Sequence, residues 1–279
     1  MSGIGNAADC KSVASAFLVR VQGDPLIRAT FIVAHFFLFD FLKKLLYNIY
    51  MIKIKRKKKG LFSMDKYLSI ITNFGCHYSC PYCIVKENNL KIPKTTIGGL
   101  DTVQIAFDSH NCNWVSLSGG GDPLFGIDNE YNKLWYKRLF FQFPNTPIEL
   151  HTSYIRNDID LSKFARVVYH IRNFEDLTRI KRQGNQIIRV VFVVTEDFTI
   201  NYIDKIYEFV NNSTEIDELS FRQMVDNNYN TTYYCYDYLM AGHLKKWHYI
   251  EQNDYNIYYC ENKVSYRYKD FESEEKVNE

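Results

Sequence analysis

The chain has 279 residues, which is enough for one sizeable domain or two small ones. Hydrophobic residues make up 46% of it, so we expect a packed core, and a net charge of +2 is too small to indicate a nucleic-acid-binding protein by itself. Three of the seven cysteines are clustered and four are scattered. This excludes the disulfide framework of a small secreted protein, and we expect a reducing, cytoplasmic environment.

Residues 1–63 differ from the rest of the chain and are expected to form an N-terminal extension. Apolar stretches within residues 26–54 are interrupted by charges, and residues 55–59 are all basic. A spanning helix needs about 20 predominantly apolar residues. Three interpretations stay open: a dispensable extension, weak membrane association through residues 26–59, and a packed helix.

Three cysteines follow the first strand predicted after this extension. The apolar residues 67–72 predict a buried β-strand, and Cys76, Cys80 and Cys83 follow it in a C-x3-C-x2-C pattern. Three thiolates on one loop can converge on one metal centre, and such soft donors suit zinc or an iron–sulfur cluster. Tyr82, directly before the third cysteine, would shield the centre from water.

A glycine-rich turn follows the second predicted strand, residues 114–117. It contains Gly120, Gly121 and Asp122. Glycines after a strand allow the backbone to approach a ligand closely. Alone, this turn is a weak signal, but its position behind the three-cysteine loop makes it informative.

Together, the two motifs resemble those of the radical S-adenosylmethionine family, over roughly residues 64–225. The resemblance implies that the three cysteines hold a [4Fe–4S] cluster whose open iron binds S-adenosylmethionine. It also implies that the two glycines and Asp122 contact the amino group of that cofactor, although most members have Glu at the position of Asp122. The implied reaction is reductive cleavage to a 5′-deoxyadenosyl radical, which abstracts hydrogen from a substrate.

The following segments alternate between strands and helices. Further strands are predicted at residues 148–153, 166–171, 187–194 and 218–224. Helices are predicted from Asp101, which with Gln104 would form a capping box, and around residues 131–139, 175–182 and 203–210. Six strands alternating with helices predict an α/β fold, an open partial (β/α)6 barrel like part of a TIM barrel, with ligands at the carboxyl ends of the strands.

Polar residues at these carboxyl ends are further candidates for cofactor binding. By the resemblance, residues after the third strand lie near the adenosyl group, and residues at the end of the fourth bind ribose or the methionine carboxylate. An arginine within the sixth strand needs a partner, either a ligand carboxylate or an acidic side chain. The candidates are Thr152, Ser153, His170, Arg172 and Arg222, with His151 as either a site residue or a core histidine.

The core domain is expected to span residues 64–226, and residues 227–279 to form a small C-terminal cap. In the family such tails cover the barrel mouth and choose the substrate. A short hairpin is predicted around Glu261 and Asn262. Cys235 and Cys260 are too few for a second cluster, and Cys112 should lie at the far end of the barrel.

The resulting prediction is a radical S-adenosylmethionine enzyme that uses a reductant such as flavodoxin or ferredoxin. Its substrate is unspecified, with a peptide or protein favoured over a nucleoside or RNA. The alternative is a non-catalytic zinc- or cluster-binding module, with His77 as a fourth zinc ligand and with residues 55–59 and 178–182 touching nucleic acid. A family member that binds the cluster but has lost turnover is a third reading.

Overall fold

The structure is a computed structural model that describes residues 65–241, 247–250 and 257–271. The chain divides into two compact units, Met1–Met64 and Asp65–Glu279. The predicted N-terminal extension, with its membrane-associated stretch, lies outside the described residues. Within the described part of the chain, no helix is both long and apolar enough to cross a bilayer.

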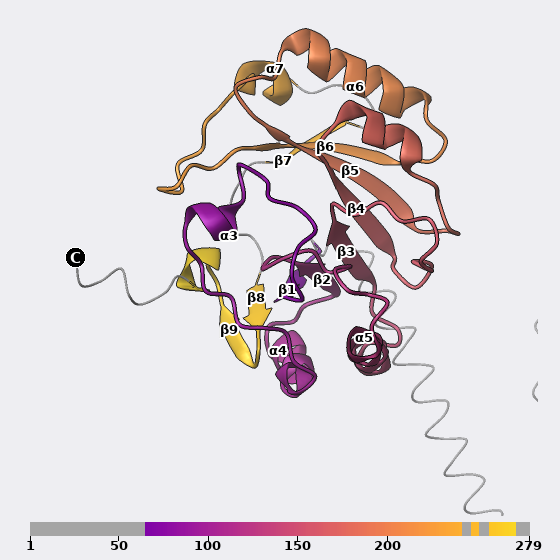
Figure 1. Ribbon diagram of the computed structural model, residues 1–279, viewed down its shortest axis with the longest axis vertical. Coiled ribbons are helices and arrows are strands. Elements are labelled where there is room, and N and C mark those ends of the chain that lie inside the picture. The colour runs from indigo at the N-terminus through magenta and orange to yellow at the C-terminus, as the bar shows by residue number, and fades with distance from the viewer. Residues whose placement is uncertain (1–64, 242–246, 251–256, 272–279) are drawn as a thin grey trace, which may run out of the picture. The chain divides into compact units, whose positions relative to one another are not determined.

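A single open sheet forms the centre of the second unit (Figure 1). Among the described residues it contains nine strands in the order β7-β6-β5-β4-β3-β2-β1-β8-β9. Six of them are β1 (Tyr67–Ile71), β2 (Trp114–Ser118), β3 (Ile148–Thr152), β4 (Arg166–Ile171), β5 (Ile187–Val194) and β6 (Glu218–Gln223). These six pair in chain order and in parallel, as predicted, and each lies within one residue of its predicted bounds.

The C-terminal tail extends the sheet at both edges, which the expectation of a simple cap did not include. Strand β7 (Trp247–Ile250) pairs in parallel with β6, and β8 (Ile257–Cys260) pairs in parallel with β1. Strand β9 (Lys263–Ser265) then pairs antiparallel with β8, which confirms the predicted hairpin at Glu261 and Asn262. The pairing of β8 with β1 brings the tail beside the strand that leads into the cysteine loop.

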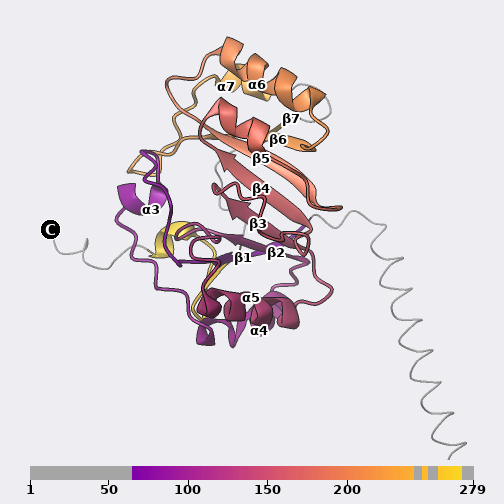
Figure 2. The same cartoon turned by 45° about the vertical axis from the view of Figure 1, so that its right-hand side comes forward.

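Helices pack outside the sheet and form the main hydrophobic core with it. In Figures 1 and 2, α4 and α5 lie beside the β1–β3 part of the sheet, and α6 and α7 lie beyond β5 and β6. The α-helices are α3 (Ile84–Glu87), α4 (Val103–Ser109), α5 (Glu130–Gln142), α6 (Ile200–Asn212) and α7 (Tyr236–Met240), and the 3-10 segments are η1 (Gly98–Leu100), η2 (Phe174–Arg179) and η3 (Tyr268–Phe271). Alternate strand residues such as Leu117, Leu150 and Val190 are fully buried against them. Cys112 is buried in this core.

Several helix predictions need correction. Asp101 pairs with Arg138 instead of capping α4, whose N-cap residue Thr102 makes no side-chain capping bond. Within the helix predicted around residues 131–139, Tyr131 and Leu134 would be core residues by their apolar spacing, but they are 48% and 52% exposed, because α5 buries Trp135, Tyr136 and Leu139 instead. The helix predicted at 175–182 is the shorter 3-10 segment η2. Leu177 is its one buried residue, so no repeating apolar face supports a longer α-helix.

The other face of the sheet is polar. On β2, Val115 and Leu117 join the hydrophobic core, whereas Ser116 and Ser118 alternate with them and line a cavity. The same alternation sets Glu149 and His151 on β3 opposite the apolar Leu150. A polar inner face is costly in a dry core, so it marks the side of the sheet on which a ligand can bind.

Candidate functional site

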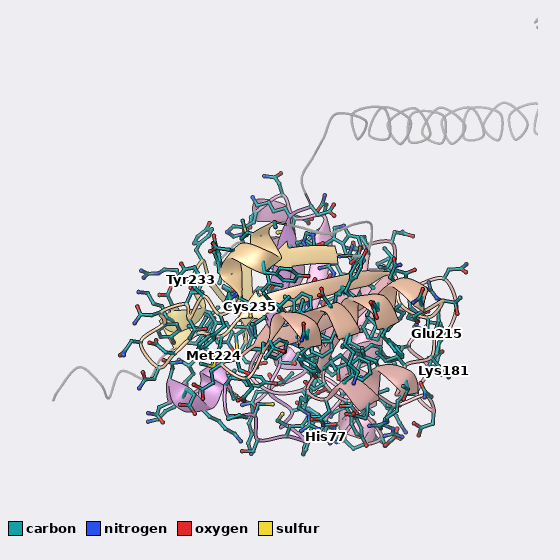
Figure 3. All side chains as sticks on the ribbon, turned by 90° about the horizontal axis from the view of Figure 1, so that it is seen from above. His77, Lys181, Glu215, Met224, Tyr233 and Cys235 are labelled. Carbon is teal, nitrogen blue, oxygen red and sulfur yellow. The ribbon has the colours of Figure 1, made fainter. Side chains whose placement is uncertain are left out.

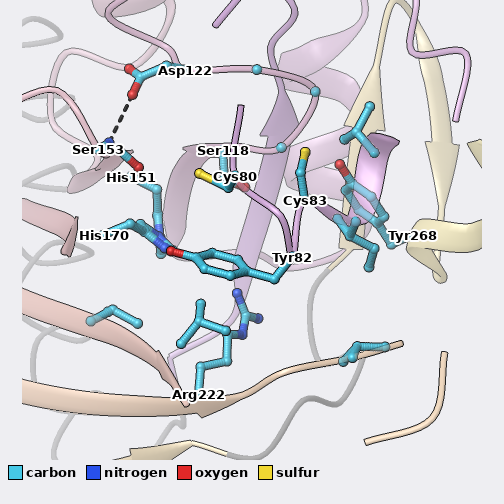
Figure 4. Close-up of a pocket in the computed structure, with 18 of the residues that line it drawn as sticks. Cys80, Tyr82, Cys83, Ser118, Asp122, His151, Ser153, His170, Arg222 and Tyr268 are labelled. Carbon is cyan, nitrogen blue, oxygen red and sulfur yellow. Dashed lines mark hydrogen bonds between the residues drawn. The ribbon is translucent and has the colours of Figure 1, made fainter. Parts of the chain in front are cut away.

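One cavity of about 620 Å³ lies at the carboxyl ends of the strands, where the sequence places its motifs (Figure 4). Its volume is in the range of sites that hold a small molecule or cofactor. Eleven of the twelve predicted site residues line it: Cys76, Cys80, Tyr82, Cys83, Gly120, Gly121, Asp122, Thr152, Ser153, His170 and Arg222. The exception is Arg172. The structure therefore brings together residues that lie far apart in the sequence.

The cysteine loop presents all three thiols to this cavity. Cys76 is exposed, Cys80 and Cys83 are half-buried, and α3 begins directly after Cys83. Burial raises the pKa of the Cys80 thiol; the nearby Arg172 opposes this effect, and the neighbouring Cys76 and Cys83 thiols add to it. The three sulfur atoms are thus within electrostatic reach of one another. Among residues 65–241, 247–250 and 257–271, however, no three His, Cys, Asp or Glu side chains are grouped as ligands of a metal ion.

A single zinc ion and a multinuclear cluster make different demands on this loop. One zinc ion holds each thiolate at about 2.3 Å, so its ligands must crowd together, whereas an iron–sulfur cluster distributes its thiolates over several irons. His77 is poorly placed as a fourth zinc ligand, because its ring stacks on Tyr154 with centroids 3.8 Å apart. Figure 3 shows His77 at the rim of the domain.

A buried hydroxyl on the tail also fits an anionic, thiolate-bound group. Tyr268, on η3, lines the cavity and is 9% exposed, and its Oη atom has no hydrogen-bond partner among the described residues. Burial raises the pKa of this phenol, and the next contribution comes from Cys83. In Figure 4 the hydroxyl points toward the Cys83 side chain. A neutral donor at this position would stabilise extra negative charge on a cluster.

Replacing Tyr268 with Phe tests whether this hydroxyl acts on a bound cluster. We expect the cluster of Tyr268→Phe to form but to have a lower reduction potential, by tens of millivolts, because a hydrogen bond to sulfur favours the reduced state. A redox titration followed by EPR measures the shift. Tyr266→Phe is the matched control, since Tyr266 lies on the same tail but is 63% exposed. Equal potentials in Tyr268→Phe and the unmodified protein would refute this role of the hydroxyl.

The glycine-rich turn packs against the residues that precede the cysteine loop. The Asp122 N–H donates to the Gly75 carbonyl at 2.9 Å, directly before Cys76. A Cβ atom at Gly121 would lie 2.2 Å from the same carbonyl oxygen, and one at Gly120 would lie 2.6 Å from Ile92. Space that we expected a ligand to occupy is thus filled by protein at these two points. The glycines hold the two loops together, while their backbone still lines the cavity.

We therefore expect Gly121→Ala to be strongly destabilising, since the atom it meets is backbone and cannot rotate away. The expected loss in unfolding free energy is about 3 kcal/mol, at the upper end for overpacking, and cluster retention should fall as the loops separate. Gly98→Ala is the control, because the nearest atom to its new Cβ would be 3.8 Å away. Urea denaturation of both variants gives the comparison. Equal stabilities would show that the two loops can separate without cost.

Asp122 is a buried carboxylate that ties the glycine-rich turn to the end of β3. It is 4% exposed, and it accepts hydrogen bonds from the Leu124 N–H at 2.9 Å, the Thr152 hydroxyl at 2.7 Å and the Ser153 N–H at 2.9 Å. Three donors already occupy most of its acceptor capacity. Asp122 is therefore a support of the cavity wall, with room for at most limited contact with a cofactor ammonium.

Of the aromatic and cationic side chains predicted for the site, Tyr82 and Arg222 line the cavity and Arg172 does not. Tyr82 covers the cavity, and in Figure 4 its ring points toward His170. Burial, followed by the neighbouring Cys80, raises the pKa of Tyr82 to about 12, so its hydroxyl stays protonated. Arg222 faces the cavity from β6. Arg172 instead stacks on Tyr78, with Cζ 3.5 Å from the ring centroid, and its charge acts on the cysteine loop.

A chain of charged side chains beneath the cavity was not predicted. Glu149 accepts from Arg166 at 2.8 Å and contacts His151 at 2.7 Å, and His151 contacts His170 at 3.0 Å. His151 is therefore part of the polar site and not an isolated core histidine. The signal was present in the sequence, because Glu149 and His151 alternate in an otherwise apolar strand. Tyr268 gave no such signal.

Comparisons with known proteins give only remote similarity. No protein-family model and no curated protein matches this sequence. Among solved structures, the chain is similar to Streptococcus suis SuiB bound to the precursor peptide SuiA, at 14% identity and a TM-score of 0.45, over 76% of this chain and 54% of that chain. It is also similar to Streptococcus suis SuiB bound to S-adenosylmethionine, at 15% identity and a TM-score of 0.43, over 71% of this chain and 48% of that chain. The chain thus spans about half the length of these proteins, and we infer function from the cavity itself.

Proposed function

We propose that this chain is a radical S-adenosylmethionine enzyme. The observation that carries the proposal is that the three cysteines and the glycine-rich turn line one cavity at the carboxyl ends of parallel strands. When bound, a [4Fe–4S] cluster would supply the electron that cleaves S-adenosylmethionine to a 5′-deoxyadenosyl radical. We assign the cluster to Cys76, Cys80 and Cys83.

The protein's own side chains would bind and orient S-adenosylmethionine and shield the thiolates from water. We propose that Gly120, Gly121 and Asp122 shape the wall for the methionine end, and that Thr152 and Ser153 border the adenosyl group. Arg222 offers a cation to a carboxylate of the cofactor or substrate. The aromatic ring of Tyr82 keeps water from the thiolates.

We propose a peptide or protein substrate, a reductant of the flavodoxin or ferredoxin type, and a cytoplasmic location. The tail supports the substrate assignment, because its Tyr258, Arg267 and Lys269 line the cavity and could hold a chain at the mouth. Tyrosines also stack on nucleobases, which keeps a nucleoside as the alternative.

The test is 5′-deoxyadenosine release. The protein is reconstituted with iron and sulfide in the absence of oxygen and is then mixed with dithionite and S-adenosylmethionine. It should release 5′-deoxyadenosine, which mass spectrometry detects. Cys83→Ala is the matched negative control. A synthetic peptide library that increases the release more than an RNA oligonucleotide pool supports the peptide assignment. Zinc in place of iron, with no 5′-deoxyadenosine, would favour the binding module.

A further inference from the structure

The charged side chains that line the cavity are mostly cationic. Among the described residues of its wall, Lys86, Arg222, Arg267 and Lys269 carry positive charge, whereas Asp122 is the one carboxylate. Asp122 is 4% exposed and already accepts three hydrogen bonds within the wall. A carboxylate bound in this way offers little to a ligand, so the cavity presents an excess of positive charge.

The proposed cofactors account for only part of this excess. The Lys86 Nζ atom donates to Ser79 Oγ at 2.7 Å, and its charge is among those that oppose burial, which raises the pKa of Cys80. Lys86 therefore acts on the thiols, and Arg222 is already assigned to a carboxylate of the cofactor or substrate. A cluster held by three thiolates is anionic and S-adenosylmethionine carries a net positive charge, so the two nearly cancel. Arg267 and Lys269 are left for another ligand.

Both remaining cations lie on a part of the tail that is anchored beside the cavity. Tyr268 and Phe271 of η3 are buried in a small hydrophobic cluster with Ile71. Arg267 and Lys269 flank Tyr268 and are exposed. Arg267 Nη2 pairs with Asp270 at 2.9 Å and keeps further N–H donors, whereas no described acidic side chain forms an ion pair with Lys269.

We propose that Arg267 and Lys269 select peptide substrates that bring an aspartate or glutamate side chain to this mouth of the cavity. The planar guanidinium group matches a carboxylate with two parallel N–H donors, and the lysine ammonium adds a second positive charge beside it. This inference rests on the proposed function for the peptide nature of the substrate. The charge of the mouth, however, comes from the tail and does not depend on the cluster.

The arrangement favours an acidic peptide over a nucleic acid. A protein that binds a single strand needs a positively charged groove that follows successive phosphates. The tail contributes only two cations to the described wall of the cavity, and the Asp270 carboxylate lies directly beside one of them. A run of phosphates would meet this carboxylate, whereas a single side-chain carboxylate needs only the two cations.

The test is fluorescence anisotropy with the full-length protein, reconstituted without oxygen and mixed with S-adenosylmethionine but no dithionite. The probes are short peptides of alternating Glu and Gly, Gln and Gly, or Lys and Gly, each with the same uncharged fluorophore. We expect the Glu peptide to bind most tightly and the Lys peptide most weakly. The double variant Arg267→Gln, Lys269→Gln should bind the Glu peptide about tenfold more weakly, the loss expected for two partly exposed charge contacts.

The matched control is the double variant Lys137→Gln, Arg138→Gln, which removes the same two charges from α5. Arg138 pairs with Asp101 as Arg267 pairs with Asp270, and neither Lys137 nor Arg138 lines the cavity. This control should bind the Glu peptide as the unmodified protein does. Both double variants should fold, because each replaces side chains outside the hydrophobic core.

Equal binding of the Glu and Gln peptides, or an equal loss in the two double variants, would overturn the proposal. So would an oligouridine RNA that binds more tightly than the Glu peptide and is released by the tail substitutions, which would assign the mouth to nucleic acid. The measurement needs no turnover. Selective Glu-peptide binding without 5′-deoxyadenosine release would count against the radical chemistry alone, and release without such selectivity would count against this substrate class alone.

Discussion

Cys80→Ala is expected to reduce the iron content of the reconstituted protein from about four atoms per chain to near zero. Cys80 is the central thiol of the loop, and both Cys76 and Cys83 act on it electrostatically. A cluster already bound by only three thiolates has no protein ligand to spare. Iron and sulfide analysis after anaerobic reconstitution measures the effect.

Cys235→Ala is the matched control for this loss. Cys235 is partly buried at the start of α7, outside the cavity lining, and its thiol contacts the Phe198 carbonyl at 3.4 Å. It should keep the full iron content. A Cys80→Ala protein that retains as much iron as Cys235→Ala would remove the three cysteines from the metal site.

Arg166→Met is expected to lower the unfolding free energy by about 3–5 kcal/mol at pH 7, the range for breaking a buried ion pair. The Arg166 side chain is 9% exposed and the Glu149 side chain 6%. Removal of the Arg166 guanidinium group leaves the Glu149 carboxylate buried with much of its charge uncompensated. Chemical denaturation measures the loss. The control Arg138→Met breaks an exposed ion pair with Asp101 and should cost less than about 1 kcal/mol.

The loss of unfolding free energy caused by Arg166→Met should become smaller as the pH falls. The folded-state pKa of Glu149 lies below its ordinary value of 4.5, so the ionised group contributes stability above that pH and loses it as pH falls toward the folded-state pKa. Without Arg166 the pKa rises, because burial then acts with less opposition. The two proteins should therefore approach each other in stability between pH 7 and about pH 4. A constant difference across this range would show that Glu149 does not depend on Arg166.

The six central strands could be predicted because each carries its own signal. The run of β-branched residues in β5 indicates a strand of a parallel sheet, and α6 shows Ile203, Ile206 and Val210 at helical spacing, all fully buried in the structure. The cysteine and glycine motifs are also local. Their meeting in one cavity follows from parallel pairing, which carries the ends of all strands to one edge of the sheet.

The missed features depend on pairings that no local pattern encodes. Glu149 and Arg166 face each other because they are register partners on β3 and β4. Tyr268 comes within electrostatic range of Cys83 because the pairing of β8 with β1 places the tail beside the strand that leads into the cysteine loop. Strand β7 has four residues, and its place beside β6 comes from tertiary contact. In each case the interaction links segments that are distant in sequence, and secondary-structure propensities do not predict such interactions.

The most direct test of the central claim is the EPR spectrum of the reduced, reconstituted protein with and without S-adenosylmethionine. If the open iron of a three-cysteine cluster binds that cofactor in the cavity, adding it should shift the spectrum. The shift should be absent in Cys80→Ala. A cluster whose spectrum is indifferent to S-adenosylmethionine, or a protein that takes up zinc instead of iron, would contradict the assignment.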